Sequence, residues 1–267
     1  MKLLIFLLLS STIFISCVKD RETLIERAKT PEELKAEKNK EKKIKSYKNL
    51  AMESIREKNY PEAYENLFKA VKIAPGDKEL HNLLGLTYLY DGKEERAVKE
   101  FKKAIEIDGN YSEAHNHLGI VYSEKEEFKK AEKEFKKALD NLTYKTPWIA
   151  YTNLGRVYLL SGKFQKAIKT FKRSLSKNSR QCIPYQSLAE LYRKENNFEN
   201  AEINYLSAIK YCLNPEEIEK DLALMYIQNK KYVKAKEELE KCIKGAKLKS
   251  KRKLLENCKH YMNLLEE

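Results

Sequence analysis

The chain has 267 residues, with 53 Lys and Arg against 40 Asp and Glu, which gives a formal net charge of +13. With only 8 Gly and 6 Pro, the composition excludes a loop-rich β-sandwich and a disordered chain rich in Pro and Gly. Hydrophobic residues make up 42%, which argues against a wholly disordered chain. These numbers are typical of a mostly helical protein whose charges are dispersed over solvated helix faces.

Residues 1–16 have the pattern of an export signal. Lys2 supplies a positive start, and Leu3–Ile15 is apolar but too short to span a bilayer comfortably. The run ends at Ser16-Cys17, which resembles a bacterial lipobox, where the cysteine receives a diacylglyceryl group and becomes the mature N-terminus. We therefore predict a lipoprotein signal peptide over 1–16 and lipid attachment at Cys17. The alternatives are an ordinary signal peptide or an N-terminal anchor helix.

A charged segment follows over residues 17–43, and we expect it to act as a solvated, partly helical tether between lipid and folded body. Thr30, Pro31 and Glu32 predict a helix start, because threonine caps a helix, proline suits its first position and acids suit its first turn.

The rest of the chain repeats with a period of 34 residues. One alanine marks each period, with a single spacing of 36: Ala63, Ala97, Ala131, Ala167, Ala201 and Ala235. A small residue stands twelve positions before each of them: Ala51, Gly85, Gly119, Gly155, Ala189 and Ala223. Small residues on two antiparallel helices allow close approach, and the bulky residue four positions after each alanine fills the space beside them. We therefore predict stacked helical hairpins, with Gly119 and Ala131 facing each other.

This pattern resembles the tetratricopeptide repeat family. The residues Leu84-Gly85-Leu86-Thr87-Tyr88 and Phe101-Lys102-Lys103-Ala104-Ile105 carry the likeness most clearly. The resemblance implies an all-α fold: an α-solenoid, coiled as a right-handed superhelix, of about six repeats over 44–249. Residues 250–267 follow as a C-terminal capping helix, since apolar residues recur there at helical spacing.

Four cysteines lie in the last third of the chain. An exported protein meets an oxidising compartment, so an even count invites disulfides. In the repeat register, Cys182 and Cys212 lie at one end of the same hairpin, and Cys258 lies on the cap that packs against Cys242. We predict disulfides Cys182–Cys212 and Cys242–Cys258, with buried free thiols as the alternative.

No catalytic constellation is present in the sequence. His81 and His115 occupy equivalent repeat positions, which points to packing, and His117 lies on a different side of its helix from His115. No phosphate-binding glycine loop accompanies them. We expect no enzyme activity, no cofactor, no metal and no nucleic-acid partner.

The repeat surface predicts instead a peptide-binding groove on the concave side, formed by the first helix of each pair. Amide side chains bond a peptide backbone there, and aliphatic side chains receive its apolar residues. The predicted groove residues are Met52, Asn82, Leu86, Asn116, Ile120, Thr152, Arg156, Leu159 and Gln186. A generic solvated surface is the alternative.

A narrower resemblance lies at the junction between the third and fourth repeats, where two residues are inserted. Residues 138–155 resemble the type IV pilus biogenesis and stability family, pilotins of the PilW, PilF and Tgl kind. The likeness is carried by Tyr144, Thr146, Pro147, Ala150, Tyr151, Asn153, Leu154 and Gly155. The resemblance implies a periplasm-facing lipoprotein of the outer membrane that binds secretin subunits and assists their multimerisation. The alternative is a general periplasmic scaffold for envelope or peptidoglycan-processing complexes.

Overall fold

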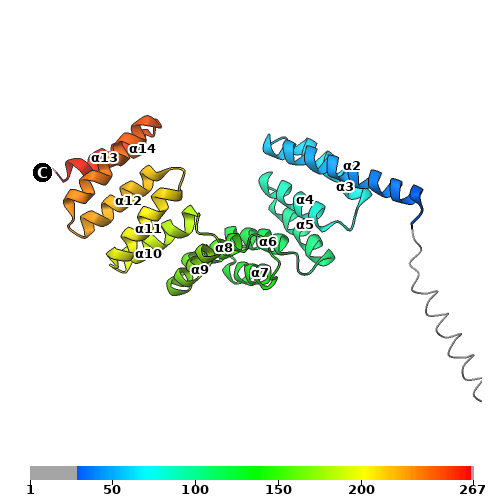
Figure 1. Ribbon diagram of the computed structural model, residues 1–267, viewed down its shortest axis with the longest axis horizontal. Helices are drawn as coiled ribbons and strands as arrows, with labels where there is room; N and C mark the ends of the chain where they lie inside the picture. The colour runs from blue at the N-terminus through cyan, green and yellow to red at the C-terminus, as the bar shows by residue number, and fades with distance from the viewer. Residues whose placement is uncertain (1–28, 266–267) are drawn as a thin grey trace, which may run out of the picture. The chain divides into compact units, whose positions relative to one another are not determined.

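The computed structural model describes residues 29–265, and it contains helices but no strand within that range (Figure 1). The signal peptide and Cys17 predicted above lie outside the described residues. The helices are α2 (Pro31–Arg56), α3 (Tyr60–Ile73), α4 (Lys78–Tyr90), α5 (Glu94–Ile107), α6 (Ser112–Glu124), α7 (Phe128–Asp140), α8 (Pro147–Leu160), α9 (Phe164–Lys177), α10 (Cys182–Lys194), α11 (Phe198–Tyr211), α12 (Pro215–Gln228), α13 (Tyr232–Leu248) and α14 (Arg252–Asn263).

The chain divides into two compact units at Pro75 and Gly76, a division that the repeat pattern does not predict. The described part of the first unit is one hairpin of α2 and α3. The predicted helix start is confirmed: Thr30 caps α2, and its side chain and that of Glu33 each bond the other's backbone N–H. No break separates residues 43 and 44, because α2 runs through the predicted boundary between tether and repeats.

The second unit contains five helical hairpins followed by α14. Each odd-numbered helix from α5 to α13 packs on the even-numbered helix before it, and successive hairpins pack on one another along the unit. Helix α14 packs against α13, so the predicted terminal helix is confirmed. The unit is therefore an all-α solenoid, in which each hairpin buries apolar surface against its neighbours.

Phenylalanine rings lie directly against glycines inside three of the hairpins. A Cβ added to Gly119 would lie 2.8 Å from the nearest ring atom of Phe135, and equivalent contacts join Gly85 to Phe101 and Gly155 to Phe171. All three rings are fully buried. Glycine is required in these three hairpins because the first helix approaches the ring more closely than a side chain allows.

Each hairpin turns through one residue with positive φ. Gly92 and Gly162 occupy this position in two hairpins, and Asn196 occupies it in a third. In the other hairpins Lys58, Glu126 and Lys230 adopt the same conformation, which L-residues seldom adopt. The backbone N–H of the following residue donates to a carbonyl five residues earlier, as from Lys93 to Tyr88 at 2.8 Å, which closes the end of the helix.

Partly buried glutamates join neighbouring hairpins. The hydroxyl of Tyr158 donates to Glu132 Oε1 at 3.0 Å, and Lys163 Nζ donates to Oε2 at 3.2 Å. Burial raises the pKa of Glu132, but the bonds from Lys136, Lys163 and Tyr158 outweigh it and hold the pKa at about 2. Two hairpins further along the chain, the Tyr226 hydroxyl and Lys234 Nζ donate to Glu202 in the same way.

The histidines predicted to have packing roles are indeed buried between helices. His81 lies 2.7 Å from Glu100, and His115 lies 2.6 Å from Glu134, in each case across the same hairpin. These equivalent contacts pin α4 to α5 and α6 to α7.

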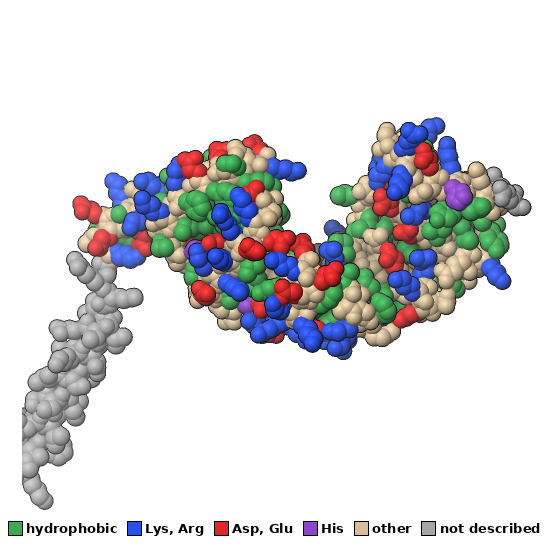
Figure 2. All heavy atoms as spheres, turned by 180° about the vertical axis from the view of Figure 1, so that it is seen from behind, with side chains coloured by type: hydrophobic (Ala, Val, Ile, Leu, Met, Phe, Trp, Pro, Cys, Tyr) green, Lys and Arg blue, Asp and Glu red, His purple; other side chains and the backbone are tan. Residues whose placement is uncertain are grey.

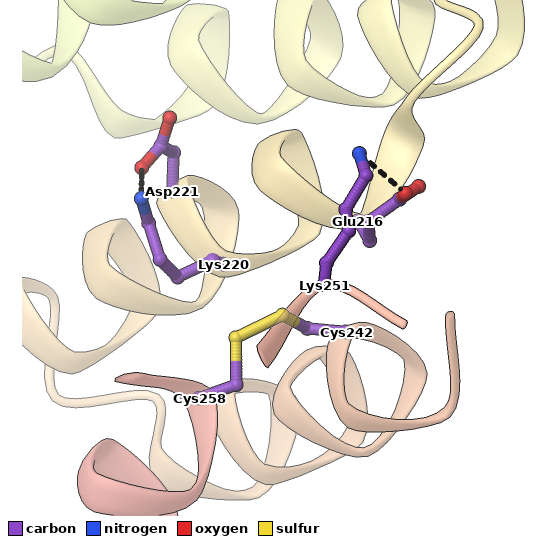
Figure 3. The surroundings of a disulfide bond; sticks show 6 residues. All are labelled: Glu216, Lys220, Asp221, Cys242, Lys251 and Cys258. Atoms are coloured by element: carbon purple, nitrogen blue, oxygen red, sulfur yellow. Dashed lines mark ion pairs between the residues drawn. A yellow bond between two sulfur atoms is a disulfide. The ribbon is translucent and has the colours of Figure 1, made fainter. Parts of the chain in front are cut away.

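Two disulfides staple the C-terminal third, and they are the two pairs that the repeat register predicts. Cys182 begins α10 and bonds Cys212 at the end of α11, with Cα atoms 4.8 Å apart. Cys242 on α13 bonds Cys258 on α14 (Figure 3). Beside this second bond, Glu216 is almost fully buried and pairs with Lys251 Nζ at 2.8 Å. The chain that leads into α14 is therefore held both covalently and by charge.

None of the described helices is both long and apolar enough to cross a bilayer.

Replacing Gly119 with alanine is expected to destabilise the fold. A helical glycine-to-alanine change gains about 1 kcal/mol in propensity, whereas overpacking against Phe135 costs about 1–3 kcal/mol. The midpoint of urea unfolding, followed by circular dichroism, is therefore expected to fall. Phe135→Leu in the Gly119→Ala protein removes the opposing ring atoms and should recover part of the loss. The matched control is Gly109→Ala, whose Cβ meets nothing within 4 Å, and an equal loss there would contradict the steric account.

Removing either disulfide is expected to lower the free energy of unfolding by about 2–4 kcal/mol, because the crosslink restricts the unfolded chain. The Cys182→Ser/Cys212→Ser protein should lose at least as much as Cys242→Ser/Cys258→Ser, since its closed loop spans 30 residues against 16. Urea unfolding of the oxidised proteins measures both losses, and the reduced wild type serves as the control. Equal stability of oxidised and reduced wild type would show that the crosslinks contribute nothing.

Candidate protein-binding groove

A hollow of about 550 Å³ lies where the first helices of three successive hairpins, α4, α6 and α8, meet. Three predicted groove residues, Leu86, Asn116 and Ile120, line it. The remaining lining residues are Leu89, Tyr90, Glu113, His117, Glu124, Tyr144, Thr146 and Ile149. These three residues therefore share one hollow, and its binding of a peptide stays a prediction.

Leucine and isoleucine side chains give the hollow its apolar character. Leu86 on α4 and Ile120 on α6 stand at the same repeat position, and each directly follows a glycine that contacts a phenylalanine ring. Successive residues of a helix point about 100° apart, so a glycine that faces the partner helix places the next residue toward the hollow. The packing of each hairpin thus positions the apolar wall of the groove.

Polar side chains beneath this wall bond across repeats. His117 Nδ1 donates to Asn82 Oδ1 at 2.8 Å, and Asn153 Nδ2 donates to Asn116 Oδ1 at 3.2 Å. The ring of His117 also lies against Phe101, with centroids 5.4 Å apart. Burial lowers the pKa of His117 to about 4, so its imidazole is neutral at pH 7.

Two of the predicted groove residues lie below the surface instead. Asn82 is only 7% exposed and its oxygen accepts from His117, so it supports the groove rather than lining it. Thr152 is also 7% exposed and bonds Ser174 Oγ at 2.7 Å on the second helix of its own hairpin. Neither residue lines the hollow, whereas Asn116, at the equivalent repeat position, lines it although it is only 3% exposed. Contact of Asn82 and Thr152 with a ligand stays a prediction.

The other predicted residues lie elsewhere along the first helices. Arg156 is exposed and lines a small hollow of about 60 Å³ together with Ile120. Leu159 is half-buried against the main core, and Gln186 is half-buried on α10. Met52 is exposed on α2, in the first unit. The structure does not bring these four residues into the hollow with Leu86, Asn116 and Ile120.

Eight of the lining residues were absent from the predicted set, among them Tyr90, Glu113 and Glu124. Tyr90 and Glu124 are the last residues of α4 and α6, and Glu113 lies in the first turn of α6. The signal available for them was the helical period, since residues 113, 116, 120 and 124 recur on one face of a helix. The inserted junction at 144–149 closes one side of the hollow, which explains the contribution of Tyr144, Thr146 and Ile149.

Among the described residues no group of three His, Cys, Asp or Glu side chains is placed to hold a metal ion. Figure 2 shows basic side chains interspersed with acidic ones over the face that it displays, so the net positive charge is not gathered into one patch there.

Acid is expected to destabilise the wild type more than a His117→Asn protein. The unfolded imidazole takes up a proton near pH 6.5, whereas the folded one resists protonation until about pH 4, so stability falls as the pH drops through this window. Between pH 7 and pH 5 the free energy of unfolding of the wild type should fall by about 1–2 kcal/mol more than that of the His117→Asn protein. Urea unfolding at each pH measures this difference. Asparagine is the residue at the equivalent position of the next repeat, Asn153, which makes it a mild replacement. Identical pH profiles would contradict a buried neutral imidazole.

Family models for tetratricopeptide repeats match this chain over residues 112–177 and 184–215, and a TPR repeat model matches residues 87–126. No curated protein matches the chain by sequence.

Solved structures with similar folds include PilF of Pseudomonas aeruginosa, at 19% identity and a TM-score of 0.73, over 84% of this chain and 99% of that one. PilW, described as a widely conserved type IV pilus biogenesis factor, matches at 21% identity and a TM-score of 0.64, over 74% and 92% of the two chains. YrrB, described as a TPR protein with an unusual peptide-binding site, matches at 20% and 0.57, over 73% and 97%. At these identities the likeness concerns the fold. The chain therefore contains tetratricopeptide repeats and folds as an all-α solenoid of the kind that serves as a protein-binding scaffold.

Proposed function

We propose that this chain is a non-catalytic, protein-binding lipoprotein that assists assembly of a type IV pilus secretin in the outer membrane. The observation that carries the proposal is the apolar hollow at α4, α6 and α8, on a repeat scaffold whose fold is similar to those of PilF and PilW. The inserted junction that resembles this family forms part of the hollow through Tyr144, Thr146 and Ile149.

The groove suits recognition of a chain that has not yet assembled. Leu86, Ile120 and Ile149 offer apolar contact to a side chain that an unassembled subunit exposes. Release follows once the subunit buries that side chain against another copy, so the cycle needs no chemical step. Acyl chains on Cys17 hold the scaffold at the membrane surface, because two or three such chains anchor a protein firmly.

Crosslinking from inside the groove tests the proposed partner. A photoreactive phenylalanine analogue replaces Tyr90, which lines the hollow and is 59% exposed, so the change leaves the core intact. In cells that express the full chain, irradiation is expected to link it to a secretin subunit. The matched control places the same analogue at Lys102, an exposed position on α5 outside the hollow, and should give no such product.

Deletion of the gene is expected to leave secretin monomers in place of detergent-resistant multimers, visible on an immunoblot of membranes. A Cys17→Ser protein should restore multimers poorly, because it lacks the lipid. Normal multimers in the deletion strain would refute the secretin role. Capture of peptidoglycan hydrolases from Tyr90 instead would identify a general envelope scaffold.

A further inference from the structure

The groove differs from the rest of the protein in its charge. The chain carries a net charge of +13, yet the residues that line the hollow include two glutamates and neither lysine nor arginine. His117, the remaining titratable base in the lining, is neutral at pH 7 because burial lowers its pKa to about 4. The hollow is therefore a local acidic site on a basic molecule.

Within residues 29–265 neither Glu113 nor Glu124 forms a hydrogen bond or a direct ion pair. Lys78 nevertheless interacts electrostatically with Glu113, and Arg156 lines a small hollow together with Glu124. Lysines close to them are already engaged: Lys78 Nζ pairs with Asp108 at 2.5 Å, and Lys125 Nζ pairs with Glu94 at 3.4 Å. Glu132, by contrast, is bound by three side chains, those of Lys136, Lys163 and Tyr158. Charge is thus left available at the groove.

The spacing of the two glutamates defines what fits between them. They stand at the two ends of α6, eleven residues apart, which places them on one helical face about 16 Å apart along the axis. Ile120 lies between them, and Leu86 and Ile149 lie across the hollow on α4 and α8. Leu86, Ile120 and Ile149, which we call the apolar floor of the hollow, therefore lie between two negative charges, one at each end of α6.

We propose that this hollow binds a protein segment in which apolar residues lie between two basic residues, with one lysine or arginine paired to Glu113 and the other to Glu124. The inference rests on the proposed function in one respect only, that the groove binds protein. An extended segment spans about 16 Å in about five residues, so the two basic residues lie about that far apart. Leucine, isoleucine or phenylalanine between them contacts the floor. Paired charges at the rim of an interface select the partner and its orientation more than they add affinity.

A charge-swap experiment on peptide arrays tests this inference. The full-length chain, produced with Cys17→Ser so that it carries no lipid, is applied to an array of ten-residue peptides of varied sequence. We expect the bound peptides to be enriched in the pattern basic, apolar, basic. A Glu113→Lys/Glu124→Lys protein should lose about tenfold or more in signal on these peptides, and it should instead select peptides with aspartate or glutamate in the same two places.

A matched control changes the same number of charges outside the groove. Glu95 and Glu106 are exposed and are also eleven residues apart, but they lie on α5 and do not line the hollow. The Glu95→Lys/Glu106→Lys protein should keep the wild-type preference. If it loses that preference equally, general charge and not the groove is responsible, and the inference is overturned.

A third protein separates this inference from the proposed function. Leu86→Asp/Ile120→Asp removes the apolar floor and should abolish binding of all selected peptides, with circular dichroism confirming that the helices remain. Loss of binding here combined with no charge preference in the wild type would refute the acidic selection but leave a protein-binding groove. Binding unaffected by this change, or no peptide bound by the wild type, would overturn both.

Discussion

The structure depends on the contact between a glycine on the first helix of a hairpin and a phenylalanine ring on the second. Gly85, Gly119 and Gly155 allow this contact in three successive hairpins, and those hairpins include the helices that form the groove. Because the residue after each glycine points about 100° away, internal packing and the outer wall are specified by adjacent positions in the sequence. A change that loosens the hairpin therefore also displaces the binding surface.

Much of the fold could be predicted from the sequence because its determinants are local and recur. The alanine and glycine positions indicate which helices pair, Thr30 and Pro31 indicate where α2 begins, and the register places the four cysteines in two pairs. Because the same residue pattern recurs in every hairpin, a departure in one hairpin does not obscure it. An example is the lysine or glutamate that adopts a left-handed conformation where glycine is expected.

The composition of the groove could be predicted only in part. Leu86, Asn116 and Ile120 follow from the repeat register, whereas Asn82 and Thr152 satisfy buried partners that only coordinates reveal. A short polar side chain at this position reaches either a ligand or a neighbouring helix, and the period is the same in both cases. The acidic character of the hollow depends on the absence of lysine and arginine from lining residues that come from three separate helices, so no local pattern indicates it.

Both disulfides lie beyond residue 181, so covalent reinforcement is confined to the last two hairpins and α14. In a solenoid each hairpin is supported mainly by its nearest neighbours, and local opening spreads from the least supported end. Mechanical tension or partial denaturation should therefore unfold the hairpins on the N-terminal side first. The disulfide-crosslinked C-terminal hairpins and α14 should stay folded longest. When the stress is removed, the remaining hairpins can refold against this folded C-terminal part.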